Sequence, residues 1–384
     1  MTTTWDCIVL GVGGFGSGTL YHLARRGARV LGIEQFTVAH DRGSSHGQTR
    51  IIRKAYFEHA DYVPLLHRAY YLWRELEAET SQTLFHPVGL FIAGGGNSEA
   101  VEGTLHAAKV HQLPVDQLTP REAATRFPVY RFPQEMRIVF EQDAGYLDVE
   151  NCVTAHIDAA QRCGAVLKTG ETVRAWQVSG DTVHVTTGSG RYSAARLIIT
   201  AGPWSSRLLA DLGLPLHVVR KPVCWFPATD PRFDASSRNP AFFFDLAGGQ
   251  FYGFPRLDGC TIKVAEHTGG DLVGNPHQPD RNLHAADVSR LSQFLETHIP
   301  LAGRQPATHS ICMYTKTPDG HFLIDRHPRY PHVLFGAGFS GHGFKFTTVL
   351  GEVLADLALD GRTAQPIGFL SAKRFDGTTP AGAQ

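Results

Sequence analysis

Asp6-Cys7-Ile8-Val9-Leu10-Gly11-Val12-Gly13-Gly14-Phe15-Gly16 is the stretch that decides the fold of this chain. An apolar run enters a glycine-rich turn, and a second apolar run, Val30-Leu31-Gly32-Ile33, follows and ends at Glu34. This pattern is typical of a strand, a tight turn, a helix and a second strand that together bind a dinucleotide. The second glycine lets the backbone approach a pyrophosphate, and the third packs the helix onto the strand. We therefore predict a dinucleotide-binding βαβ unit whose helix starts near Ser17 and runs to Gly27.

The same residues outline a cofactor site. The first amides of the helix and its dipole would face the phosphates, and the acid would hold a ribose hydroxyl. An acid at this position argues against a 2′-phosphate and hence against NADP, but it does not separate NAD from FAD. The residues assigned to the cofactor from this motif are Gly11, Gly13, Gly14, Phe15, Gly16 and Glu34.

Length and composition exclude several classes of protein. The chain has 384 residues, enough for two domains around a cleft. Its 36 basic and 36 acidic side chains cancel, which argues against a nucleic acid partner, and the absence of a long apolar run argues against a membrane span. The six cysteines show no Cys-x-x-Cys spacing and the 20 histidines no His-Glu-x-x-His pair. We therefore expect neither a disulfide framework nor a metal site.

The ends of the chain also bear on location. Met1 to Trp5 lack the basic and apolar regions of a secretory signal, and Ala381 to Gln384 do not form a peroxisomal address. Together with the reduced cysteines, this predicts a cytoplasmic protein.

Hydrophobic periodicity organises the first two thirds of the chain. Apolar residues at helical spacing predict helices over 61–80, 98–110 and 149–163. Short β-like runs with glycine turns follow at 166–168, 173–176, 183–185 and 197–200. The last run leads through Gly202 into a helix that is expected to include Leu208 and Leu209.

The remainder indicates a second sheet and a return to the first domain. Residues 218–262 are rich in aromatic and turn residues, which suggests a mixed sheet with a wall that faces a ligand. A strand at 333–335, a glycine-rich segment at 336–343 and a helix at 344–359 then restore the α/β pattern. Because the nucleotide-binding pattern begins at residue 6 and resumes near residue 310, we predict interleaved domains.

Two clusters of charged residues could carry chemistry. Arg50 and Arg53 lie three residues apart, and arginine suits a bidentate grip on a carboxylate; the alternative is a solvated basic turn. Lys263 and His267 would share one face of a strand. A lysine between Ile262 and Val264 is either partly buried for a functional reason or exposed on an edge strand.

A third cluster lies near the carboxyl end, where Cys312-Met313-Tyr314-Thr315-Lys316-Thr317-Pro318-Asp319 is followed by Gly336-Ala337-Gly338-Phe339-Ser340-Gly341-His342-Gly343-Phe344-Lys345-Phe346. Four glycines before a helix form a second backbone nest for an anionic ring or phosphate. Lys345 would lie in the first turn of that helix, where the dipole disfavours a cation. A residue placed against local preference is more often functional.

In combination these motifs resemble the flavin-dependent family of the sarcosine and N-methyltryptophan oxidases, which is related more distantly to glycine oxidase and D-amino-acid oxidase. The resemblance covers nearly the whole chain and selects FAD over NAD. It rests on the fingerprint, the block from His46 to Arg53, Tyr252-Gly253-Phe254-Pro255, the segments from Cys260 to His267 and around Cys312, and Gly338 to Lys345.

The resemblance implies roles for individual residues. Cys312 matches a cysteine bonded covalently to the flavin; its alternative reading is a small buried hydrophobe. Arg53 and Lys345 match the pair that holds the substrate carboxylate, and Lys263 matches the lysine that activates dioxygen. The resemblance further places His267, Tyr252, Tyr314 and Phe243 in the substrate pocket, with Phe243 where sarcosine-specific members carry methionine. It places His46, Thr49, Arg50, Val173, Gly338, Gly341, His342, Gly343, Phe344 and Lys345 at the cofactor, with Arg50 against the flavin ring.

The resemblance also implies a fold and a reaction. It implies a Rossmann-type FAD-binding domain of residues 1–50, 145–217 and 310–384, interleaved with a mixed-sheet substrate domain of residues 51–144 and 218–309. The implied reaction is that of a monomeric oxidase. An N-methyl amino acid, most simply sarcosine, passes a hydride equivalent to the flavin, the resulting imine is hydrolysed by water to formaldehyde and glycine, and O2 reoxidises the flavin to give hydrogen peroxide. The alternatives are an oxidase of N-methyltryptophan, pipecolate or proline, an NAD-dependent dehydrogenase and a non-catalytic flavin-binding protein.

Overall fold

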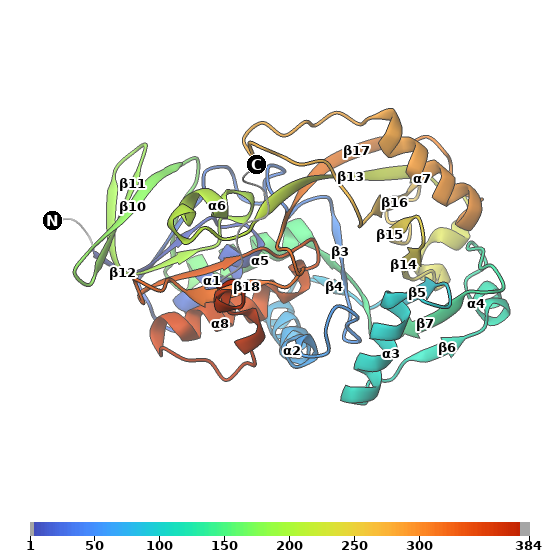
Figure 1. Cartoon of the computed structure of the whole chain (residues 1–384), viewed down its shortest axis with the longest axis horizontal. Helices are drawn as coiled ribbons and strands as arrows, with labels where there is room; N and C mark the ends of the chain where they lie inside the picture. The colour runs from blue at the N-terminus through green and yellow to red at the C-terminus, as the bar shows by residue number, and fades with distance from the viewer. Residues whose placement is uncertain (1–3, 377–384) are drawn as a thin grey trace.

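The computed structural model describes residues 4–376, and Figure 1 shows two lobes side by side. Each lobe contains one 8-stranded sheet, and a three-stranded sheet lies between them. The predictions on the terminal signals concern residues that lie largely outside the described range. Within that range, no helix is both long and apolar enough to cross a membrane.

The first sheet is parallel at its centre. Strand β1 pairs in parallel with β12 on one side and β2 on the other, β9 extends the sheet beyond β2, and the carboxyl end of β12 pairs in parallel with β19. An antiparallel ribbon of β10 and β11 continues from β12, and β18 pairs with β19. The strands are β1 (Thr4–Leu10), β2 (Val30–Ile33), β9 (Val166–Lys168), β10 (Val173–Ser179), β11 (Thr182–Thr187), β12 (Arg191–Ile199), β18 (Leu323–Arg326) and β19 (Val333–Ala337).

A group of helices covers one face of this sheet. Helix α1 packs against both α5 and α8, and α2 packs against the same two helices. Their apolar sides meet in a core that contains Leu20, Trp73 and Leu350, all fully buried. The helices are α1 (Gly14–Arg25), α2 (Tyr62–Thr80), α5 (Val149–Arg162) and α8 (Thr347–Leu359).

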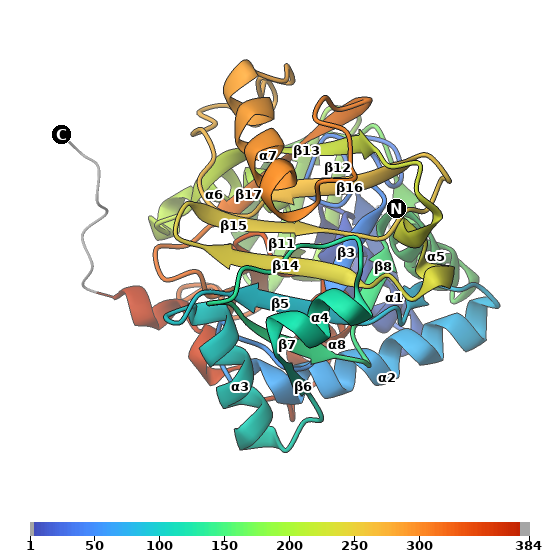
Figure 2. The ribbon, with the colours of Figure 1, turned by 90° about the vertical axis from the view of Figure 1, so that its right-hand side faces the viewer.

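The second sheet is mixed and runs in the order β17-β13-β16-β15-β14-β5-β7-β6. All its neighbours are antiparallel except β14 and β5, which are parallel. In Figure 2 the helices α3, α4 and α7 lie around this sheet. The elements are β5 (Leu90–Gly94), β6 (Asp116–Leu118), β7 (Arg137–Glu141), β13 (His217–Pro227), β14 (Ala241–Leu246), β15 (Gly249–Gly253), β16 (Thr261–Glu266), β17 (Thr308–Lys316), α3 (Glu99–His111), α4 (Pro120–Arg126) and α7 (Ala285–His298).

Alternation along the strands gives the second sheet two different faces. Cys224, Phe226, Ile262 and Val264 pack into a core shared with Phe294 of α7. The intervening residues of the same strands point to the opposite face, because successive side chains of a strand alternate. Val223 and Ala265 on that face belong to a separate cluster with Phe243 and Tyr252.

The small sheet and several short turns complete the chain. Strands β3 (Thr49–Ile52), β8 (Gly145–Asp148) and β4 (Phe85–His86) pair in that order. The short elements are α6 (Ser205–Leu208) and the 3-10 turns η1 (Gly202–Trp204), η2 (Ala210–Leu212), η3 (Pro231–Phe233), η4 (Ala235–Ser237), η5 (Phe344–Phe346), η6 (Gly368–Leu370) and η7 (Ala372–Phe375).

The α/β class and the mixed second sheet are confirmed, and the helices predicted over 61–80, 98–110 and 149–163 are each confirmed to within one residue. Three details differ. Helix α1 begins at Gly14 rather than near Ser17, the helix after Gly202 ends before Leu209, and residues 344–346 form a 3-10 turn that precedes α8. Strand β17 belongs to the second sheet, although residues 310–384 were assigned to the first domain. The two large sheets each draw on separated stretches of chain, and we retain the interleaved domain boundaries as a proposal.

Candidate active site

A long cavity of about 1350 Å³ follows the carboxyl ends of the central strands of the first sheet. Ligands of doubly wound α/β sheets bind in this place. Its lining includes Gly11, Gly13, Gly14, Phe15, Glu34, Arg50, Val173, Tyr314, Gly341, Gly343 and Phe344. These come from the fingerprint, from the 173 segment and from the second glycine nest, so the structure brings the two predicted glycine regions to one cavity.

The glycine turn has the close approaches that the fingerprint requires. Gly11 has a φ of +81°, and a Cβ on it would lie 2.8 Å from the Cα of Ala201. A Cβ on Gly16 would lie 1.9 Å from the carbonyl oxygen of Gly11, so any side chain there would separate the helix from the turn. In contrast, the nearest atom to a Cβ on Gly13 is the Ser45 hydroxyl at 3.9 Å. The space over Gly13 is therefore open to a ligand.

Glu34 holds this turn as well as facing the cavity. Its carboxylate accepts hydrogen bonds from the amides of Val12 at 2.8 Å and Phe36 at 3.0 Å. His40 lies 3.4 Å from the same carboxylate. The acid that the sequence predicts at a ribose hydroxyl therefore also fixes the backbone of the glycine turn.

Cys312 lies in a cationic environment. Its sulfur is 3.3 Å from Nε2 of His46 and accepts a hydrogen bond of 3.3 Å from the Arg50 guanidinium. Burial opposes ionisation, but His46 and Arg50 outweigh it and lower the pKa of the thiol to about 6. Cys312 is buried, as a small hydrophobe would be, and it differs from the other buried cysteines in its contacts with His46 and Arg50. Cys7, Cys152 and Cys224 have raised pKa values.

A second cavity of about 500 Å³ adjoins the first. The two share four lining residues, Arg50, Tyr314, Gly341 and Phe344. The other lining residues of the second cavity are Ile51, Arg53, Glu58, Phe243, Tyr252, His267, His342 and Lys345. Almost all side chains that the sequence assigned to the substrate therefore meet in one place, although they come from six separate stretches of chain.

Arg53 is buried and bound to a carboxylate of its own chain. Its guanidinium donates to both oxygens of Glu58, at 2.7 and 2.8 Å, and lies between the rings of Tyr56 and Phe57, 4.4 and 4.1 Å from their centroids. The alternative of a solvated basic turn is wrong, because only 4% of Arg53 is exposed. Arg50, three residues earlier, points instead to Cys312 and to the Ser44 carbonyl.

Lys345 provides the second cation of this cavity. Lys345 lies in η5, before α8 begins. Its predicted position in the first turn of that helix, where the dipole disfavours a cation, is therefore wrong. Its Nζ donates to the carbonyl of His342 at 2.7 Å. Burial and the neighbouring Arg53 lower its pKa to about 7, against the opposing effect of Glu58.

One wall of the second cavity is aromatic and contains Tyr252, Tyr314 and Phe243. His267 lies 5.6 Å from the Tyr314 ring and 6.1 Å from the Phe243 ring. Burial lowers the pKa of His267 to about 3, so its imidazole is neutral at physiological pH. This wall therefore adds neutral hydrogen-bonding groups to the cavity that holds the two cations.

Lys263 is buried in a central strand. Strand β16 lies between β13 and β15, which excludes the alternative of an exposed edge lysine. Its Nζ donates to the carbonyls of Gly47 at 2.6 Å and Thr49 at 2.8 Å and to the Thr49 hydroxyl at 2.9 Å. Burial, with a contribution from Arg50, lowers the pKa of Lys263 well below its usual value.

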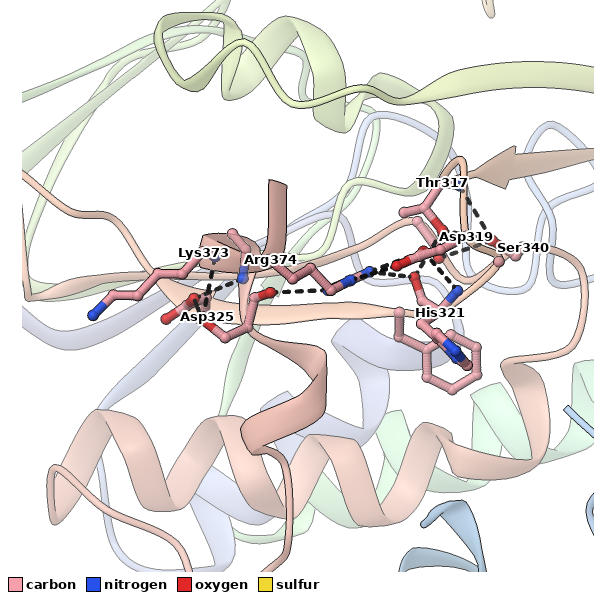
Figure 3. A network of polar contacts seen from close by, with 12 residues as sticks. Thr317, Asp319, His321, Asp325, Ser340, Lys373 and Arg374 are labelled. Atoms are coloured by element: carbon pink, nitrogen blue, oxygen red, sulfur yellow. Dashed lines mark hydrogen bonds and ion pairs between the residues drawn. The ribbon is translucent and has the colours of Figure 1, made fainter. Parts of the chain in front are cut away.

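His342 was predicted at the cofactor but lines the second cavity. Its Nδ1 is hydrogen-bonded to the hydroxyl of Tyr56, and its Nε2 lies 3.0 Å from the carbonyl of Gly320. Arg374 fixes the turn that contains Gly320, because it donates to Asp319 and to the His321 carbonyl (Figure 3). The carboxyl-terminal segment thus supports one wall of the second cavity.

Comparison with known proteins identifies the family. The family model described as FAD dependent oxidoreductase (DAO) matches residues 6–357. The chain belongs to this family of FAD-dependent oxidoreductases. The oxidoreductase is 41% identical over 383 residues to the monomeric sarcosine oxidase of Streptomyces avermitilis, which covers 98% of this chain and 99% of the relative.

Two further similarities extend the comparison. The oxidoreductase is 36% identical over 375 residues to the N-methyl-L-tryptophan oxidase of Citrobacter koseri, covering 97% of this chain and 99% of the relative. Its structure superposes with a TM-score of 0.85 on that of NikD, titled an unusual amino acid oxidase essential for nikkomycin biosynthesis, at 26% identity and with 96% and 98% of the two chains covered. The resemblance to the sarcosine oxidase family is therefore confirmed, and the NAD-dependent alternative is wrong.

The residues present fit FAD. The open space over Gly13, the carboxylate of Glu34 and the extent of the first cavity suit the ADP half, and the cavity continues past Arg50 and Tyr314 to the boundary of the second. Among residues 4–376, no group of three or more histidine, cysteine or acidic side chains is arranged to hold a metal ion.

Sequence reasoning missed Glu58, Tyr56 and Glu150 as parts of this region. Glu58 follows Arg53 by five residues within Arg53-Lys54-Ala55-Tyr56-Phe57-Glu58, where two aromatic residues lie between the opposite charges. That spacing could have signalled a buried ion pair. Nothing local marks Glu150, because its partners lie about 100 residues earlier in the chain.

Proposed function

We propose that this FAD-dependent oxidoreductase oxidises an N-methyl amino acid, most simply sarcosine, to the primary amino acid, formaldehyde and hydrogen peroxide. The observation that carries this proposal is the pair of buried cations, Arg53 and Lys345, in a small cavity that adjoins the cofactor cavity. A carboxylate is the group that two buried cations at one end of a cavity recognise. A simple amine without a carboxylate is a poor substrate on this account.

Bound FAD would supply the two-electron oxidation of the substrate and the reduction of O2. The protein's own groups bind and orient. Arg53 and Lys345 hold the carboxylate, which directs the amine toward the aromatic wall of Tyr252, Tyr314 and His267. Because His267 is neutral, it can accept a hydrogen bond from the amine or donate one, and it adds no charge that would repel a cationic substrate.

We further propose that Cys312 forms a thioether with a methyl carbon of the flavin of FAD. A C–H bond of that methyl group would break, the thiol and the carbon would each release a proton, and the two electrons would pass through the flavin to O2 to give hydrogen peroxide. The thiolate is the nucleophilic form of cysteine, and the contacts of His46 and Arg50 with the sulfur favour it. Cys312→Ser is expected to leave all of the flavin extractable by acid, whereas the unchanged enzyme should retain its flavin in the precipitate. Flavin that stays attached in the variant would assign the bond to another residue.

We propose Lys263 as the residue that promotes the reaction with O2. A fixed ammonium near the reacting centre would stabilise the negative charge that develops on oxygen. Lys263→Met should slow reoxidation of the reduced enzyme by O2 far more than its reduction by substrate, as followed by stopped-flow absorbance. An equal loss in both half-reactions would contradict this role.

The test of the substrate class is peroxide production over a panel of amines. Sarcosine, N-methyltryptophan, pipecolate and proline are compared with dimethylamine, which lacks the carboxylate. We expect turnover of sarcosine and none of dimethylamine. The second candidate is another secondary amino acid such as N-methyltryptophan, because Phe243 lines the cavity where the resemblance places a methionine in sarcosine-specific members, and the panel separates the two.

The assembly and the location are part of the same proposal. We propose that the enzyme acts as a monomer in the cytoplasm. The similarity to relatives named monomeric sarcosine oxidase supports the monomer, and residues of a single chain line both cavities. Size-exclusion chromatography with light scattering tests it, and a dimer mass would contradict it.

A further inference from the structure

The turn of residues 46–49 connects several parts of the site, and one carboxylate holds it. Glu150, in the first turn of α5, accepts hydrogen bonds from the amide of Gly47 at 2.7 Å and from the amide of Gln48 at 3.1 Å. The turn adopts left-handed backbone angles, with φ of +86° at Gly47 and +69° at Gln48. A non-glycine residue in this region carries strain, so the turn needs an external partner to keep its shape.

The same turn provides the acceptors for Lys263. An ammonium has three protons to donate, and the Gly47 carbonyl, the Thr49 carbonyl and the Thr49 hydroxyl accept them. All three acceptors belong to the segment whose amides Glu150 binds. Trp225, the cross-strand partner of Lys263, donates to the Gln48 side chain at 2.9 Å and closes the other side of the turn.

We propose that Glu150 is a positioning residue that holds the 46–49 turn so that it cages the ammonium of Lys263 for the reaction with O2. This inference rests on the proposed function of Lys263. It assigns Glu150 no contact with substrate or cofactor. Glu150 acts on Lys263 through its hydrogen bonds to the turn and through its negative charge.

The charge of Glu150 acts in the same direction as its hydrogen bonds. The groups that act on Lys263 come from three elements: Arg50 of β3 disfavours the ammonium, while Cys312 of β17 and Glu150 of α5 favour it. His46 completes the set of titratable groups at the turn and contacts Cys312. Removing the negative charge of Glu150 should therefore lower the pKa of Lys263 further, and the enzyme should lose its reactivity with O2 at a lower pH.

The first measurement is independent of catalysis. Amide hydrogen exchange of the holoenzyme, read on peptides that cover residues 44–52, should become at least about tenfold faster at Gly47 and Gln48 in Glu150→Gln. A glutamine offers one neutral oxygen in place of two charged ones, so it accepts from these backbone N–H groups more weakly than the carboxylate does. Unchanged exchange at these two amides would overturn the inference.

The second measurement separates the half-reactions by stopped flow. In Glu150→Gln we expect reoxidation by O2 to slow about tenfold or more, its alkaline limit to move to lower pH, and reduction by substrate to change by less than twofold. A loss shared equally by both half-reactions would overturn the positioning role, since a general structural defect would give that result.

Glu77→Gln is the matched control. The Glu77 carboxylate also accepts from two consecutive amides, those of Leu84 and Phe85, both at 2.8 Å, but it lies in α2 outside both cavities. We expect this variant to leave both half-reactions unchanged. If Lys263→Met slows only reoxidation and Glu150→Gln leaves reoxidation unchanged, the inference about Glu150 fails and the proposed function of Lys263 stands. If Lys263→Met affects both half-reactions equally, the proposed function of Lys263 fails first.

Discussion

The two cavities are built in opposite ways. The shape of the cofactor cavity depends on backbone at Gly11, Gly13, Gly341 and Gly343, since a side chain at Gly11, Gly341 or Gly343 would overlap neighbouring atoms. The substrate cavity is formed by side chains, and its decisive groups are the charges of Arg53, Glu58 and Lys345. Changes to the first should therefore act through shape and folding, whereas changes to the second should act through charge and leave the fold intact.

Gly16→Ala tests the glycine turn at the cofactor cavity and should have the largest effect, a loss of stability. Its Cβ would lie 1.9 Å from the Gly11 carbonyl oxygen, an overlap with backbone that no rotamer relieves. We expect destabilisation by more than about 4 kcal/mol, measured by urea unfolding, or a failure to fold.

Gly13→Ala is the control for that change. A Cβ there meets only the Ser45 hydroxyl at 3.9 Å, so the protein should fold and yet retain less flavin after gel filtration. A Gly16→Ala protein of unchanged stability that binds flavin normally would contradict the comparison.

Arg53→Met tests the substrate cavity. The variant removes the fork that the substrate carboxylate needs and leaves Glu58 unpaired. We expect kcat/KM for sarcosine to fall about a thousandfold, equivalent to about 4 kcal/mol. The visible flavin spectrum and the flavin content should match those of the unchanged enzyme. Loss of flavin would show that the two cavities are not separable in this way.

Glu58→Gln should act in the opposite direction. In the structure, one nitrogen of the Arg53 guanidinium, Nη2, donates to both carboxylate oxygens of Glu58, so an incoming carboxylate must compete for that nitrogen. Replacing the charge with a neutral amide should lower KM for sarcosine by about fivefold, because a competing charge-assisted pair becomes a weaker hydrogen bond. A raised KM in steady-state assays would indicate that Glu58 orients Arg53 rather than competing with substrate.

The pKa of Lys345 predicts how substrate binding in the substrate cavity depends on pH. With a pKa of about 7, its ammonium is lost as the pH rises from 6 to 8, and the affinity for a carboxylate should fall over the same range. KM for sarcosine should therefore rise toward pH 8 in the unchanged enzyme. In Lys345→Met the rise in this window should be absent, and its persistence would assign it to another group.

The smallest effect concerns the helical core rather than either cavity. Burial lowers the pKa of His156 to about 3, against a usual value of 6.5, and its Nε2 has no hydrogen-bond partner. Its contribution to stability is therefore present above pH 6.5 and is lost as the pH falls toward 3. His156→Phe should reduce the loss of unfolding free energy between pH 7 and pH 5 by about 2 kcal/mol, measured by urea unfolding. His106→Ala, at an exposed position, is the control and should leave that loss unchanged.

The same contrast explains what the sequence predicts and what it does not. The glycine turn and Glu34 are local patterns, and the structure brings them to one cavity because spacing alone determines a βαβ unit. The resemblance indicated Arg53, Lys345 and His267, and all three line the second cavity. Neither route reveals the ion pair of Glu58 with Arg53 or the 3-10 turn at Lys345, because both depend on tertiary packing. The resemblance places His342 with the cofactor, whereas in the structure it lines the second cavity and is hydrogen-bonded to Tyr56.

The hydrogen bonds of Arg374 to Asp319 and His321 have a practical consequence. Figure 3 shows the segment near the carboxyl terminus tied to Asp319 and His321, and the same turn supports His342 through Gly320. Shortening the protein beyond residue 371, or attaching a bulky fusion partner there, would therefore disturb the back of the substrate cavity. An affinity tag or surface anchor for this enzyme is better placed at a site remote from that turn.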